Sequence, residues 1–158
     1  MGDSFLDIRK WLDERKLIGI KLGLKNCEIM LQRLNNPHLE FPSIHVAGTN
    51  GKGSLCVQLS SIACANNLKV GLFTSPHLIT IEERIRINGI PISPDDFDMF
   101  LNSIRDASLI PPVCNPTFFE VTFLLAMLAF RENEIDRAII ETVSYTHLTL
   151  PTKQAVLL

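Results

Sequence analysis

Positive and negative charges are nearly balanced in this sequence, whose 158 residues carry a formal net charge of −2. Nucleic acids and anionic membranes attract proteins mainly through a surplus of positive charge, so we expect neither as a partner. A local anion site remains open, because backbone N–H groups can bind an anion without any net charge on the chain.

A long apolar run is also missing. The longest one, 121–130, is interrupted by Thr122, and it falls far short of the ~20 residues that cross a bilayer. Residues 1–16 are amphipathic and charged, unlike the apolar centre of a signal peptide. We therefore expect a soluble, cytoplasmic protein.

Metal-binding cysteine patterns are absent too. No cysteine lies in a Cys-x-x-Cys pair or near histidines at the spacing of a zinc finger. We expect buried, reduced thiols, as in cytosolic proteins. The cysteines are Cys27, Cys56, Cys64 and Cys114.

The apolar pattern that is present alternates between strands and helices. Short apolar runs predict strands at 43–47, 70–74 and 137–141, and helical spacing predicts helices over 4–16, 26–36, 54–66, 93–106 and 118–130. The helix over 54–66 should bury one face, made of Leu55, Leu59, Ile62 and Ala63. This alternation indicates an α/β fold with a mostly parallel sheet flanked by helices.

A β-hairpin is predicted between the second strand and the next helix. The segments 85–87 and 90–92 alternate between apolar and other residues, and Asn-Gly at 88–89 separates them. Asn-Gly between alternating strands is typical of a type I′ turn. Arg84 and Arg86 could attract an anionic ligand such as a phosphate, but we expect them on the solvent-exposed face of this hairpin.

Three side chains are placed to cap helices. Ser93 precedes Pro94 and two acidic residues, and Thr117 with Glu120 has the spacing of a capping box. Asn26 can cap the second helix.

The segment 44–54 is the most informative, because it runs strand, glycine-rich turn, lysine, hydroxyl and helix. Such a turn wraps closely around phosphate oxygens, and the helix that follows aims free N–H groups at them. Lys52 can neutralise the β- and γ-phosphates of ATP, and Ser54 can bind Mg²⁺. The expected ATP contacts are Gly48, Thr49, Asn50, Gly51, Lys52, Gly53 and Ser54.

The match to the general phosphate-loop pattern is imperfect. Val46 stands where that pattern has glycine, and Gly53 stands where it has serine or threonine. The pattern alone therefore leaves a second interpretation open, namely a β–α turn with a solvated lysine.

The loop at 48–54 resembles the variant phosphate loop of the Mur ligase superfamily. Together with His-Val-Ala before it, it resembles the folylpolyglutamate synthase and dihydrofolate synthase branch. Further segments that resemble this branch follow in the same order, at 19–24, 73–78, 83–89 and 117–120. The resemblance covers 4–141, so 1–141 is interpreted as the N-terminal part of an ATP-binding domain.

The resemblance implies an ATP-dependent ligase that joins glutamate to a folate or to dihydropteroate through an acyl phosphate. Lys52 would be catalytic, through charge neutralisation. Glu141, which ends the last predicted strand, would be the second Mg²⁺ ligand; otherwise it is simply an acid at a strand end. The full-length protein is expected to be a monomer.

The resemblance also implies residues that contact the acceptor substrate. Ser75, Pro76 and His77 form one loop, and Thr117 and Phe119 match positions that line a pterin pocket. The competing interpretations are a rigid proline turn for the loop, a helix cap for Thr117 and a core ring for Phe119.

Residues 142–158 do not resemble the family. They resemble translated sequencing-adapter sequence, so we expect them to be artefactual; a splice variant or a frameshift is the alternative. The sheet would then be incomplete, with an uncovered edge, and the chain alone should have no ligase activity.

Two other functions stay open. One is a different Mur-type amino-acid ligase, against which Gly53 and the Ser-Pro-His loop argue. The other is a non-catalytic ATP-binding module, which would bind ATP with Mg²⁺ but not turn it over.

Overall fold

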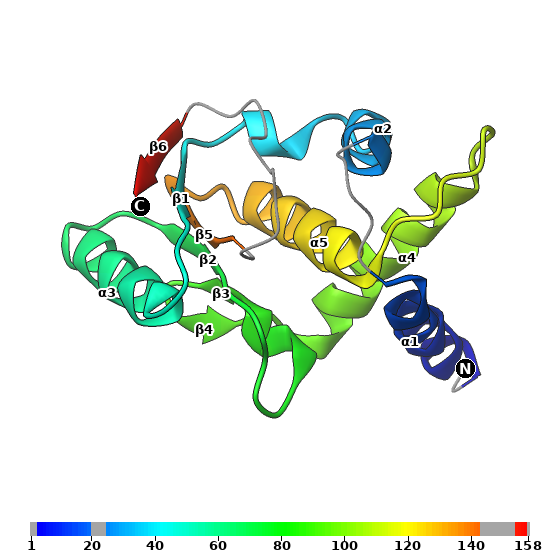
Figure 1. Ribbon diagram of the computed structural model, residues 1–158, viewed down its shortest axis with the longest axis horizontal. Helices are drawn as coiled ribbons and strands as arrows, with labels where there is room; N and C mark the ends of the chain where they lie inside the picture. Colours follow the sequence, from blue (N-terminus) through cyan, green and yellow to red (C-terminus); the bar gives the residue numbers. More distant parts are fainter. Residues whose placement is uncertain (1–2, 20–24, 143–153, 158) are drawn as a thin grey trace.

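A twisted sheet organises the chain in the computed structural model, which describes residues 3–19, 25–142 and 154–157 (Figure 1). The strand order is β4-β3-β2-β5-β1-β6. The strands are β1 (Ser43–Val46), β2 (Val70–Phe73), β3 (Ile85–Ile87), β4 (Ile90–Pro91), β5 (Arg137–Glu141) and β6 (Gln154–Leu157). Strands β2, β5, β1 and β6 run parallel, while β3 and β4 add an antiparallel hairpin. The predicted α/β fold, with its mostly parallel sheet and hairpin, is confirmed.

Helices cover both faces of this sheet (Figure 1). Helix α3 (Lys52–Ala65) packs on one face, and α5 (Phe118–Glu132) packs on the other. The helices α4 (Pro94–Leu109), α2 (Lys25–Arg33) and α1 (Asp3–Glu14) extend the layer of α5. Neighbouring strand residues separate accordingly: Ile139 packs under α3, whereas Ala138 and Ile140 pack under α5.

The packing of α5 against β2 leaves no room for a side chain at Gly71. A Cβ atom there would lie 2.5 Å from Phe130 and 2.8 Å from Ile135. The helix itself is buried over its whole apolar run, from Val121 to Phe130. Its apolar sequence thus reflects burial inside the protein. In the described residues, no helix has the length and apolarity to span a membrane.

The hairpin turn has the predicted geometry. Asn88 and Gly89 have φ angles of 49° and 82°, which a type I′ turn requires at both central positions. The Asn88 side chain also accepts the N–H of Val70 at 2.8 Å. This hydrogen bond joins the hairpin turn to the start of β2.

Two of the three predicted caps are confirmed. Ser93 accepts the N–H of Asp96 at 3.0 Å, and Thr117 forms a capping box with Glu120. The prediction for Asn26 is wrong, because it lies inside α2 and its amide donates to the carbonyl of Asn115 at 3.2 Å.

The predicted buried face of α3 is confirmed in part, since Leu55, Leu59 and Ala63 pack against the core beneath the helix. Ile62 is the exception, because it is 61% exposed, and the fully buried residues of α3 are Cys56 and Ser60. Strand β6 pairs in parallel with β1 along its whole length, so β6 forms this edge of the sheet. Residues 20–24 and 143–153 lie outside the described residues.

Candidate nucleotide and substrate site

The carboxyl ends of β1, β2 and β5 meet at one edge of the sheet, because these strands are parallel neighbours. The glycine-rich turn follows β1, the loop from residue 74 follows β2, and β5 ends at Glu141. Ligands of open α/β sheets bind at this edge. The fold therefore brings three of the predicted segments to one place.

Two glycines shape the turn between β1 and α3. Gly48 and Gly51 have φ angles of 144° and 78°, in the region that side chains disfavour. Gly51 is the N-cap of α3, so the helix begins at Lys52, two residues before the predicted start at Ser54. The glycine allows the sharp reversal that lets the helix begin so early.

The N-terminus of α3 has no side-chain cap among the described residues, unlike those of α4 and α5. Its first backbone hydrogen bond runs from Leu55 N–H to Gly51 at 3.0 Å. In the described part of the chain, no side chain caps the helix, and no acceptor is found for the N–H groups of residues 52–54. These N–H groups lie at the positive end of the helix dipole and suit an anion.

Lys52 lies at the first position of α3, half-buried. Its ammonium group donates to the carbonyl of Thr49 at 3.3 Å. The side chain therefore folds back over the glycine-rich turn. It adds a full positive charge beside the N–H groups of the first helical turn.

Glu141 joins the three segments. It is only 6% exposed, and its carboxylate accepts the backbone N–H of Ser75 at 3.0 Å. A Cβ atom placed on Gly53 would lie 3.7 Å from the same carboxylate. The carboxylate thus contacts the loop after β2 and faces the first turn of α3.

The predicted Mg²⁺ pair is not joined directly. Ser54 is exposed, and no hydrogen bond between Ser54 and Glu141 is found among the described residues. In the same part of the chain, no group of three or more His, Cys, Asp or Glu side chains could hold a metal. Mg²⁺ commonly takes one or two protein ligands together with phosphate oxygens and water. Both residues therefore stay predicted ligands.

A second carboxylate, that of Glu83, holds the later part of the loop after β2. Glu83 accepts the backbone N–H groups of residues 78–80 at distances from 2.9 to 3.1 Å. These bonds hold the pKa of Glu83 below its usual value. Leu78 and Ile79 are exposed at the tip of this loop, and Ser75-Pro76 is a cis peptide.

Arg84 was expected on a solvent-exposed face, and that expectation is wrong. Arg84 is only 8% exposed, and its guanidinium carbon lies 5.3 Å from the ring centroid of Phe118. The Nε–H group donates to Nδ1 of His77 at 2.9 Å. Burial lowers the pKa of Arg84, and the negative charge of Glu141 opposes that effect. Arg86 is half-buried and donates to the carbonyl of Glu83.

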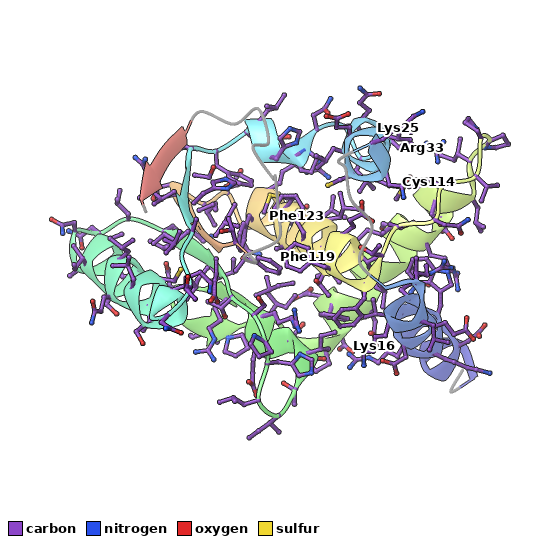
Figure 2. The ribbon with its side chains drawn as sticks, viewed as in Figure 1. Lys16, Lys25, Arg33, Cys114, Phe119 and Phe123 are labelled. Carbon is purple, nitrogen blue, oxygen red and sulfur yellow. The ribbon has the colours of Figure 1, made fainter. Side chains whose placement is uncertain are left out.

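The two predicted pterin residues have structural roles. Thr117 is buried and caps α5. Phe119 is half-buried and packs edge-to-face on Phe73, with 5.9 Å between ring centroids. Figure 2 shows Phe119 and Phe123 on the same side of α5, and both rings contact Phe73. Because Phe73 ends β2, Phe119 lies close to the loop that carries Ser75.

A cavity of about 180 Å³ opens between α1, the short helix Arg15–Ile18, α4 and the loop after β2. Its polar lining is Arg9, Asp13, Lys16 and His77, and its apolar lining is Leu12, Ile81 and Phe97. Sequence reasoning missed this cavity. Arg9 and Lys16 lie seven residues apart, about two helical turns, which was the available signal that they share a face.

No protein-family model matches the chain. The curated dihydrofolate synthase/folylpolyglutamate synthase of Bacillus subtilis is 37% identical over 146 residues, which are 90% of this chain and 34% of that protein.

Solved structures give the same picture. Mycobacterium tuberculosis folylpolyglutamate synthase complexed with ADP has a TM-score of 0.79 at 31% identity, covering 87% of this chain and 32% of that chain. A bifunctional folylpolyglutamate synthase/dihydrofolate synthase with Mn, AMPPNP and L-glutamate bound has a TM-score of 0.78 at 31% identity, covering 86% and 33%. The chain spans about a third of the length of these relatives.

Proposed function

Because this chain belongs to the folylpolyglutamate synthase and dihydrofolate synthase family, we propose that it is the ATP-binding part of a ligase that joins glutamate to a folate or to dihydropteroate. The chain spans about a third of its relatives. It therefore supplies the nucleotide site, and the complete ligation needs the part of the relatives that it does not span. The names of these relatives give no support to a cell-wall amino-acid ligase.

The uncapped N-terminus of α3 carries the proposal. Serine and threonine satisfy the corresponding N–H groups of α4 and α5. At α3, Gly51 has no side chain to do so. The phosphates of ATP supply the missing acceptors, and Lys52 neutralises part of their charge. The proposed ATP contacts are Gly48, Thr49, Asn50, Gly51, Lys52, Gly53 and Ser54.

Ser54 and Glu141 are the proposed Mg²⁺ ligands. The buried carboxylate of Glu141 faces the start of α3, and hard oxygen ligands are those that Mg²⁺ prefers. Bound there, Mg²⁺ supplies charge neutralisation for the β- and γ-phosphates.

The reaction has two steps. A carboxylate oxygen of the acceptor takes the γ-phosphoryl group of ATP, which gives ADP and an acyl phosphate. The amino nitrogen of glutamate then attacks the acyl carbon, and phosphate leaves as the amide forms and the amino group loses a proton. In-line positioning and charge neutralisation are what such transfer needs from protein.

The acceptor site is proposed to lie beside the loop after β2. It would include Ser75, Pro76, His77, Thr117 and Phe119. The contact between Phe119 and Phe73 supports this, because it places an aromatic edge near that loop. The buried, reduced thiols of Cys27 and Cys56 support a cytoplasmic compartment, and a monomer remains our proposal for the full-length protein.

Calorimetric titration of the full chain with ATP and Mg²⁺ tests the nucleotide site. Lys52→Ala should weaken binding about tenfold or more, because a charge-assisted hydrogen bond is lost. Lys69→Ala is the matched control, because Lys69 directly precedes β2 at the opposite end of the sheet. Unchanged affinity in Lys52→Ala would contradict the proposal. ATP hydrolysis by the chain alone would contradict the proposal that this chain supplies the nucleotide site but not the complete reaction.

A further inference from the structure

The buried guanidinium of Arg84 has no carboxylate partner within ion-pair distance among the residues that the structure describes. Phe118 lies against it, with 5.3 Å between the guanidinium carbon and the ring centroid. A buried N–H group that has no acceptor is costly, so the choice of acceptor matters. The acceptor of the Arg84 Nε–H is an imidazole nitrogen, not a carboxylate.

This contact determines where the His77 proton lies. Arg84 Nε donates to His77 Nδ1 at 2.9 Å, and a guanidinium can only donate. Nδ1 must therefore offer its lone pair, and the neutral ring carries its proton on Nε2. We infer that Arg84 is a positioning residue, which holds His77 as a hydrogen-bond donor through Nε2–H for the ligand of the cavity that His77 lines.

The cavity chemistry indicates the ligand. Among the described residues, no hydrogen bond uses Nε2 of His77. The Arg9 guanidinium already donates to Glu82 and Asp98, both at 2.7 Å. Arg9 and Lys16 line the same cavity, and His77 offers its N–H to an acceptor oxygen there, beside apolar residues that include Phe97. A carbonyl or carboxylate on an apolar body fits this lining. That ligand is the acceptor substrate, an assignment that rests on the proposed function.

The tautomer is measurable without any ligand. Long-range ¹H–¹⁵N spectra of the full chain at neutral pH should show His77 with Nε2 protonated and Nδ1 unprotonated. Arg84→Gln should shift the ring toward a mixture of tautomers. Arg86→Gln is the matched control, because Arg86 donates to the carbonyl of Glu83 and not to His77. A proton on Nδ1 in the unmodified chain, or unchanged His77 spectra in Arg84→Gln, would overturn the inference.

Two substitutions of His77 test the donor itself. The side-chain amide nitrogen of glutamine resembles Nε2–H in reach, whereas that of asparagine resembles Nδ1. In titrations with tetrahydrofolate, His77→Gln should bind within about threefold of the unmodified chain, and His77→Asn should lose about tenfold. Equal losses in the two variants would overturn the donor role.

The outcome also separates this inference from the proposed function. A chain that binds ATP with Mg²⁺ but shows no affinity for tetrahydrofolate would overturn the ligand assignment made here. A chain with the expected tautomer and the expected glutamine rescue, but without ATP affinity, would support the inference and contradict the proposed nucleotide site.

Discussion

The carboxylate of Glu141 accepts the backbone N–H of Ser75 at 3.0 Å, which ties the end of β5 to the loop after β2. The same carboxylate faces Gly53 in the first turn of α3. A single buried acid therefore connects the proposed nucleotide and substrate segments.

Glu141→Gln should uncouple ATP binding from Mg²⁺. The amide keeps an oxygen for the Ser75 N–H, so the fold should persist, but the negative charge for the metal is lost. Mg²⁺ should raise the ATP affinity of both proteins. We expect the factor by which it does so to be at least about tenfold smaller in Glu141→Gln than in the unmodified chain. Titrations with and without Mg²⁺ measure this. The exposed Glu132→Gln is the control, and an equal Mg²⁺ effect in Glu141→Gln would count against the metal assignment.

Alanine should have different effects on stability at Gly51 and at Gly53. Gly51 has a φ of 78°, so Gly51→Ala should lower the free energy of unfolding by about 1–2 kcal/mol. Gly53 lies inside α3, where a Cβ would make ordinary contacts with Glu141. Gly53→Ala should be neutral or stabilising by up to about 1 kcal/mol. Urea unfolding of both variants tests the pair, and an equal change in both would refute the assigned turn geometry.

Gly71→Ala should destabilise the protein through overpacking. The new Cβ would lie 2.5 Å from Phe130, and we expect a cost of about 1–3 kcal/mol or more. The same substitution should cost less when Phe130 is replaced by Leu, because the smaller side chain can move away. A double-mutant cycle from urea unfolding measures this coupling. Additive effects would argue against the close approach of α5 to β2.

Acid should destabilise the fold through two buried histidines. Burial lowers the pKa values of His38 and His45 from the ordinary value of 6.5. The unfolded chain therefore binds more protons, so stability is full above about pH 6.5 and falls as the pH drops through the lowered values. Urea unfolding across this range should show a shallower pH dependence for the His38→Gln, His45→Gln double variant. An identical slope would exclude these groups as the cause.

Local signals predicted the hairpin, two caps and the glycine-rich turn, because each depends on residues close in sequence. The Asn-Gly turn needs only its own φ angles, and the Ser93 cap needs only Asp96. The environment of Arg84 could not be predicted in this way. Its burial depends on Phe118, which belongs to α5 and lies more than thirty positions further along the chain. Alternation along a strand does not tell which face a distant helix covers.

The prediction that Ile62 is buried is wrong for a related reason. The helical period places Ile62 on one face with Leu55, Leu59 and Ala63, and those three residues do pack against the core beneath α3. Ile62 itself is 61% exposed, and the fully buried residues of α3 are Cys56 and Ser60. Which side of a helix faces the sheet depends on the strands beneath it, and the sequence of the helix alone does not contain that information.

The central claim is that backbone N–H groups at the start of α3 bind the phosphates of ATP. Amide ¹H–¹⁵N spectra of the full chain, recorded during parallel titrations with ATP and AMP in the presence of Mg²⁺, test it most directly. ATP should shift the amide signals of residues 51–54 at concentrations where AMP, which lacks the β- and γ-phosphates, leaves them in place. Equal shifts with both nucleotides, or no shift with ATP, would contradict the account.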